Sequence, residues 1–153
     1  MMYKTHAALG LLAGLLAASY VDINKYAFLA AVIFGSLFVD IDEDNSYIGR
    51  KAGFLSSVIE FLFGHRGIFH SLLAALGIFL GVYYFGHFEL GLGFLIGYAS
   101  HLAADMLTVN GVKPFYPFSR YTVRGFIRTD GLLEKLFFIL ILLAIGYIIY
   151  IKI

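Results

Sequence analysis

Five apolar segments, separated by short polar connections, constrain the fold of this chain more than any other feature. They cover residues 6–21, 26–39, 68–85, 90–107 and 132–151. A helix needs about 20 residues to cross a hydrocarbon core of about 30 Å. The last three segments meet that length, whereas the first two are short and could form a shallow hairpin instead. The pattern predicts an all-α fold, a multi-pass bundle of about five membrane helices.

The composition agrees with a lipid environment. Of the 153 residues, 61% are hydrophobic and 14% are charged, whereas soluble domains average about 45–50% apolar and about 25% charged. An ordinary water-soluble globule and a disordered chain are both excluded. A net charge of +1 offers no bulk attraction for nucleic acid, and the absence of cysteine excludes disulfides, thiolate metal sites and a cysteine nucleophile. We expect residues 1–153 to form a single domain.

Basic residues are distributed unevenly between the two sides of the predicted bundle. The N-terminus and the connections 40–67 and 108–131 carry 9 of the 11 lysines and arginines on one side or at its edge. The positive-inside rule places that side in the cytoplasm, so we predict a multi-pass protein of the inner (cell) membrane. Residues 53–63 are apolar but too short to span, and predict a short interfacial helix.

The first apolar segment also has features of a cleaved signal peptide. It follows a single early lysine, Lys4, and it is rich in leucine and small residues. We favour a retained helix because the segment carries His6, which belongs to the group of residues that we consider next.

Histidines and acids gather at the predicted cytoplasmic ends of the apolar segments. The group comprises His6, Asp40, Asp42, His65, His70, His101 and Asp105. His101 and Asp105 are four residues apart and therefore share a helix face. Carboxylates are unfavourable at a helix C-terminus and inside a bilayer, and a bound cation reverses both effects. Each residue alone has an ordinary structural explanation, but together they predict a divalent metal site. Nitrogen and oxygen donors without sulfur suit Zn²⁺, Mn²⁺ or Fe²⁺.

A Gly-His-Arg-Gly quartet at residues 64–67 precedes the third apolar segment. Its two glycines permit a tight backbone, and they would place Arg66 at a helix N-terminus, where anions are favoured. The guanidinium group suits a phosphate or carboxylate. The alternative is an arginine that extends to lipid head groups.

Four sequence blocks occur in an order that resembles the YdjM family of multi-pass inner-membrane proteins, which are described as metal-dependent hydrolases. The blocks are Thr5-His6-x-x-x-Gly10, Val39-Asp40-Ile41-Asp42, the stretch from Gly64 to Ser71, and the stretch from Gly97 to Thr108. The resemblance covers nearly the whole chain. It implies a metal site made of His6, Asp40, His65, His70, His101 and Asp105, with Asp42 and Glu134 as further candidates. Val39 and Phe69 stand where the family usually has proline and threonine, and neither change removes a ligand.

We therefore predict an integral-membrane metal-dependent hydrolase with its site at the cytoplasmic interface. Six or more ligands exceed the four of one tetrahedral site, so two or more ions, Zn or Mn, are expected. Asp40, Asp42 or Glu134 would hold a second ion or act as the general base, and Arg66 would stabilise charge on the reacting group. The expected partners are membrane lipids and a lipid phosphoester substrate, and the oligomeric state stays open.

Two other functions fit the same residues. The first is a transporter of divalent cations or protons, which would need a polar path through the bundle. The second is a scaffold that binds metal without turnover, which would need a saturated coordination shell. A coordination position open to water would favour the enzyme.

Overall fold

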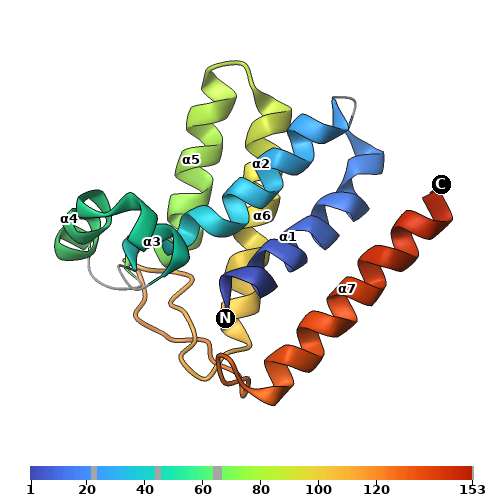
Figure 1. The fold of residues 1–153 in the computed structure, drawn as a ribbon. Helices are drawn as coiled ribbons and strands as arrows, with labels where there is room; N and C mark the ends of the chain where they lie inside the picture. Colours follow the sequence, from blue (N-terminus) through green and yellow to red (C-terminus); the bar gives the residue numbers. More distant parts are fainter. Residues whose placement is uncertain (22–23, 44–45, 64–66, 153) are drawn as a thin grey trace.

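The computed structural model describes residues 1–153 except 22–23, 44–45, 64–66 and 153. The described residues form helices joined by turns and one long loop (Figure 1). The α-helices are α1 (Tyr3–Ala17), α2 (Lys25–Phe38), α3 (Tyr47–Ala52), α4 (Phe54–Phe63), α5 (Leu72–Tyr84), α6 (Phe88–Met106) and α7 (Leu132–Lys152). Three 3₁₀ turns accompany them: η1 (Ala18–Tyr20), η2 (Val39–Asp42) and η3 (Ile68–His70). The prediction of an all-helical fold is confirmed.

The five predicted membrane crossings are all helical, but their lengths differ. Helices α1, α2 and α5 have 15, 14 and 13 residues, which is about 20–23 Å at 1.5 Å per residue. Helix α6 has 19 residues, with histidine and acidic residues among them. Among the described residues, α7 alone is both long and apolar enough to cross a membrane, over Leu132–Ile151.

The third apolar segment yields a shorter helix than its length predicted. Residues 68–70 form η3, and α5 begins only at Leu72. The Ser71 hydroxyl accepts a hydrogen bond from the Ala74 amide at 3.3 Å and so caps the helix there. His70 therefore precedes α5 instead of lying within it.

The region predicted as a short interfacial helix is helical, and a second short helix precedes it. Helix α4 matches the predicted residues 53–63 closely, and α3, which the sequence did not indicate, precedes it. Ser46 caps α3 by accepting a hydrogen bond from the Gly49 amide at 2.7 Å. The Ser56 hydroxyl donates to the Ile41 carbonyl at 2.7 Å, which fastens α4 to the turn η2.

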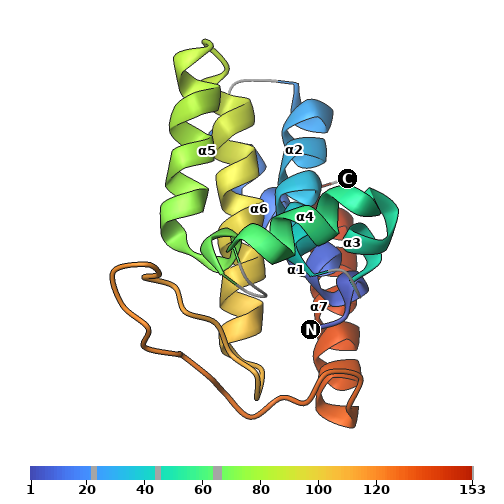
Figure 2. The same ribbon diagram turned by 90° about the vertical axis from the view of Figure 1, so that its left-hand side faces the viewer.

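Helix α6 is the centre of the bundle. It packs against α1, α2 and α5, whereas α7 lies along α1 (Figures 1 and 2). The backbones of α2 and α6 approach closely through two glycines. A Cβ on Gly97 would lie 1.9 Å from the Val32 carbonyl oxygen, and one on Gly35 would lie 2.3 Å from that of Phe94. Glycine is therefore required at both positions, as is common where membrane helices pack tightly.

The loop between α6 and α7 is a hydrogen-bonded ribbon of two arms, which extends beyond the bundle in Figure 2. Val112 and Val123 exchange two backbone hydrogen bonds of 3.0 and 2.9 Å. The Pro114 carbonyl accepts a third, from the Leu72 amide at 2.9 Å. The ribbon is thus tied to the first residue of α5.

Candidate metal centre

The predicted histidines and acids that the structure describes meet at one end of the bundle. His6 lies near the start of α1, Asp40 and Asp42 lie in η2, and His70 lies in η3. His101 and Asp105 lie in the last two turns of α6. All six residues are buried. Segments that are far apart in sequence therefore form one cluster, because the helices run back and forth between the same two ends.

The donor atoms are spaced as ligands around a cation. His101 Nε2 lies 3.5 Å from Asp40 Oδ1 and 3.7 Å from Asp105 Oδ2. His70 Nε2 lies 3.7 and 3.9 Å from the same two oxygens. These distances are too long for hydrogen bonds. Two donors that are each about 2.1 Å from a tetrahedral zinc ion are about 3.4 Å apart, so the spacing fits an ion between them.

Two buried imidazole nitrogens support the same interpretation. Within the described part of the chain, His70 Nε2 and His101 Nε2 make no hydrogen bond. A buried polar atom without a partner costs about 1–3 kcal/mol. A cation bound to both nitrogens would remove that cost.

His6 completes the cluster from the other side of His101. Its ring stacks on the His101 ring, with centroids 3.7 Å apart and an interplanar angle of 9°. His6 Nε2 lies 3.3 Å from Asp105 Oδ1. The ammonium group of Met1 lies 2.6 Å from the same oxygen. Asp105 Oδ1 therefore faces nitrogen atoms of both Met1 and His6.

Hydrogen bonds on the far side of two rings orient their Nε2 atoms toward the cluster. His101 Nδ1 lies 2.7 Å from the Ser36 carbonyl oxygen, so we assign it as the donor. His70 Nδ1 lies 3.0 Å from Asp42 Oδ1. Histidine ligands usually donate their second nitrogen to a carbonyl or carboxylate in this way, which fixes the tautomer.

The neighbouring charges shift the pKa values of Asp40 and His70. Burial alone would raise the pKa of the Asp40 carboxyl, but His101 and His70 more than offset this and hold the pKa below its usual range. Burial alone would lower the pKa of His70, but Asp40 and Asp42 raise it to about 9. The two carboxylates therefore favour positive charge at this place, which a bound metal ion would also supply.

The described donors form two overlapping groups that could hold a metal ion. Two groups, His6–Asp40–His101 and His70–His101–Asp105, each place one donor atom per residue within 4.8 Å of one another. The groups share His101, whose Nδ1 is bound to Ser36. One nitrogen with one lone pair binds one ion, so His101 can serve one of the two groups at a time. The number of ions stays a prediction, and the predicted ligand His65, like Arg66, lies outside the described residues.

Glu134 belongs to neither of the two donor groups. Its side chain is fully buried in the first turn of α7, and both carboxylate oxygens accept backbone hydrogen bonds. The donors are the Met2 amide at 2.6 Å and the Asp130 amide at 2.7 Å. This arrangement joins the start of α1 to the start of α7, which gives Glu134 a structural role. Its action as a general base stays a prediction.

The cluster is accessible through Asp40. This side chain is 11% exposed and lines a cavity of about 500 Å³. Lys4, Arg50 and the stacked rings of Tyr3 and Tyr47 also line the cavity. Glu43 lines it as well, so the cavity carries charges of both signs, and it gives water access to one side of the centre.

Sequence reasoning did not identify two parts of this site. His101 is oriented by the backbone carbonyl of Ser36. Every residue has such a carbonyl, so the residue type does not reveal this contact. The cavity residues Lys4 and Arg50 were not predicted as parts of the site. Their positions beside Asp40 depend on how α1 and α3 pack, which no local pattern reveals.

Comparison with known proteins identifies relatives of the whole chain. The family described as "YdjM inner membrane protein" matches residues 1–152. The uncharacterized protein YvsG of Bacillus subtilis (strain 168) is 36% identical over 149 residues, which cover 96% of this chain and 93% of YvsG. The inner membrane protein YdjM of Escherichia coli (strain K12) is 37% identical over 93 residues, which cover 57% of this chain and 47% of that protein. No solved structure shows significant similarity.

Proposed function

Because this chain belongs to the family of YdjM inner membrane proteins, we propose that it is a multi-pass membrane enzyme that hydrolyses a lipid phosphoester with a bound divalent ion. The family resemblance drawn from the motifs is confirmed, and the buried His/Asp cluster supports metal binding. The membrane topology, the catalytic activity and the substrate are proposals.

One observation carries the proposal: a buried set of metal donors is open to a cavity on one side. His70 and His101 are fully buried, whereas Asp40 reaches the cavity of about 500 Å³. A structural metal site is closed by protein ligands, whereas a catalytic site keeps a position open to water. The access at Asp40 favours turnover over a scaffold role.

The chemistry follows from this arrangement. A divalent ion there would polarise a phosphoryl oxygen and lower the pKa of a coordinated water toward about 7. His70 and His101 are oriented in advance by Asp42 and Ser36, so they lose little freedom on binding. Asp40, which reaches the cavity, is placed to orient the attacking water. Arg66 remains our proposed stabiliser of the phosphoryl charge.

The outer surface of the helices supports a membrane location. Helix α7 exposes Leu140 and Leu143, and α5 exposes Leu76 and Leu80. Aromatic side chains are exposed around the ends of helices away from the metal centre, as in the aromatic belts of membrane proteins. They are Tyr20, Tyr26, Tyr84, Phe85, Tyr147 and Tyr150. We propose that α1, α2, α5 and α6 lie in the membrane with α7, and that the metal centre faces the cytoplasm.

The buried residues favour hydrolysis over transport. Among the described residues, the buried side chains toward the other end of the bundle include Ala18, Phe28 and Val32, which are all apolar. A transport path needs polar groups across the bilayer. The buried histidines and carboxylates instead lie at one end.

The test uses the protein purified in neutral detergent. We expect elemental analysis to find bound zinc or manganese, and we expect phosphate release from phosphatidate, lysophosphatidate or an isoprenyl phosphate. His101→Ala should lose both properties, whereas His87→Ala, an exposed histidine at the other end of α6, should keep them. If His101→Ala binds as much metal as the parent protein, the proposed metal site is wrong. Bound metal without hydrolysis of any phosphoester would overturn the proposed enzymatic activity.

A further inference from the structure

We propose that a second cavity, formed by the two arms of the loop between α6 and α7, is an anion subsite that holds the phosphate group of the substrate. The inference deepens the proposed function and rests on it for the identity of the substrate. The cavity has a volume of about 450 Å³, which lies within the usual range for small-molecule sites.

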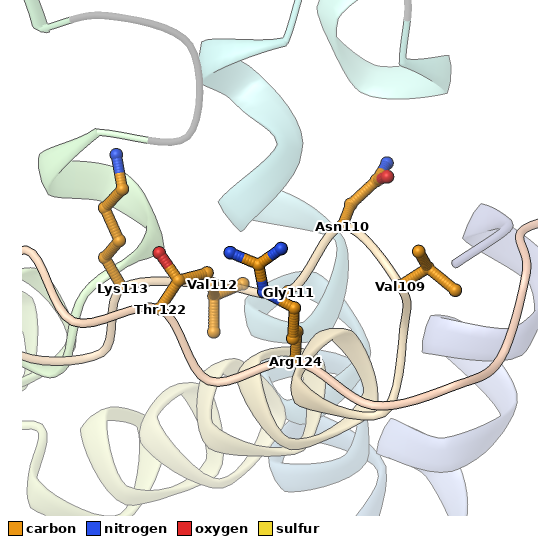
Figure 3. A pocket seen from close by; sticks show the side chains of 7 residues that line it. All are labelled: Val109, Asn110, Gly111, Val112, Lys113, Thr122 and Arg124. Carbon is orange, nitrogen blue, oxygen red and sulfur yellow. The ribbon is translucent and has the colours of Figure 1, made fainter.

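The side chains that line the cavity are those that bind phosphate. They include the Lys113 ammonium, the Arg124 guanidinium, the Asn110 amide and the Thr122 hydroxyl. Figure 3 shows the polar ends of Lys113, Arg124 and Asn110 extending to the same side of the loop. Arginine binds phosphate through paired hydrogen bonds, and lysine adds a point charge. The wall is therefore chemically matched to an anion.

The positive charge of this cavity is not neutralised by the described part of the protein. Neither Lys113 nor Arg124 has a carboxylate within 4.0 Å there, and no acidic residue is among the described residues that line the cavity. Arg124 is exposed and Lys113 is half-buried, so an anion can reach both cations from solvent.

Backbone hydrogen bonds hold the two arms in position. Val112 and Val123 pair directly, which places Lys113 beside the arm that carries Thr122 and Arg124. Gly111 adopts a φ of +66°, and a Cβ there would lie 2.3 Å from the Val123 carbonyl oxygen. The close approach of the arms therefore needs glycine. A cavity that is formed before binding loses less entropy when it takes a ligand.

The same ribbon is attached to the metal centre at two points. The Thr108 hydroxyl donates to the Asp105 carbonyl at 2.7 Å. The Pro114 carbonyl accepts from the Leu72 amide, two residues after His70. Asn110 lines both this cavity and the one that reaches Asp40. A phosphate held by Lys113 and Arg124 would thus be next to the entrance of the metal centre.

The test measures anion binding to full-length protein in neutral detergent, after metal has been removed by a chelator. The probes are inorganic phosphate and a short-chain phosphatidate. We expect Arg124→Gln and Lys113→Gln each to weaken binding by about ten- to a hundredfold. Arg120→Gln, an exposed arginine of the same loop outside the cavity, should bind as the parent does. Tighter binding of phosphatidate than of phosphate supports a lipid head group, and equal binding supports a soluble phosphoester.

Failure of this inference is distinguishable from failure of the proposed function. Equal losses in Arg124→Gln and Arg120→Gln, or no loss in either cavity variant, would overturn the subsite whatever the metal content. Arg124→Gln should retain the metal content and the melting temperature of the parent. If the protein binds no metal but phosphate binding still depends on Arg124 and Lys113, the subsite stands and the hydrolase proposal falls.

Discussion

His101 Nδ1 of α6 lies 2.7 Å from the backbone carbonyl oxygen of Ser36 in α2. This contact lies beside the glycine contact between the same helices, because a Cβ on Gly97 would lie 2.8 Å from the Ser36 amide nitrogen. The close packing of α2 against α6 therefore also orients a metal ligand. Bundle stability and metal affinity should change together when this contact is altered.

Gly97→Ala tests that coupling. The added methyl group would collide with the Val32 carbonyl, which is backbone and moves only if the helices separate. We expect unfolding to become easier by about 1–3 kcal/mol and metal affinity to fall. Thermal melting and metal titration measure the two effects. Gly77→Ala is the matched control, because nothing lies within 4 Å of its Cβ position, and it should stabilise α5 by about 1 kcal/mol or less. Equal behaviour of the two variants would contradict the role of the α2–α6 contact.

Asp42→Asn tests the orienting role of the acid behind His70. The substitution keeps the shape of the side chain but removes the negative charge beside His70 Nδ1. We expect metal affinity to fall by about 10- to 100-fold while saturating metal still restores full stoichiometry. Competition titration against a chelator gives the affinity. Asp130→Asn, at an exposed acid of the loop, should leave it unchanged. Loss of stoichiometry in Asp42→Asn would instead make Asp42 a direct ligand.

Glu134→Gln separates a structural role from a catalytic one. Glutamine offers one acceptor oxygen where glutamate offers two, so either the Met2 or the Asp130 amide loses its partner. We expect a loss of about 1–3 kcal/mol in the free energy of unfolding and an unchanged metal content. Thermal melting of the purified variant checks the first expectation. An unchanged melting temperature with abolished hydrolysis would support the general base that the sequence suggested.

Removal of metal should destabilise the parent protein. An ion present at about 100 times its dissociation constant stabilises the folded state by about 2.7 kcal/mol. We expect a chelator to lower the melting temperature, and zinc or manganese to restore it. His101→Ala should melt at the same temperature with and without chelator. A parent protein whose melting is equally insensitive would contradict a metal site built from these donors.

The helical elements could be predicted largely from the sequence. The apolar segments 26–39 and 90–107 became α2 and α6 with ends shifted by only one or two residues. The helix predicted over residues 68–85 was too long. Apolar residues alone do not show that Ile68 to His70 form a separate turn ahead of the Ser71 cap. The number of membrane crossings stays a proposal, because only α7 meets the length and apolarity of a span among the described residues.

The sequence by itself determined which end of the helices carries the histidines and acids. That position depends only on counting residues along helices that alternate in direction, and helical periodicity is a local property. Tertiary structure alone decided the roles of these side chains. It turned Asp42 to the far side of His70, gave both oxygens of Glu134 to backbone amides, and brought Lys113 beside Arg124 through the pairing of Val112 with Val123. Except for the Asp130 amide, which is four residues from Glu134, these contacts join separate segments that pack together. No local pattern encodes which atoms of separate segments face each other.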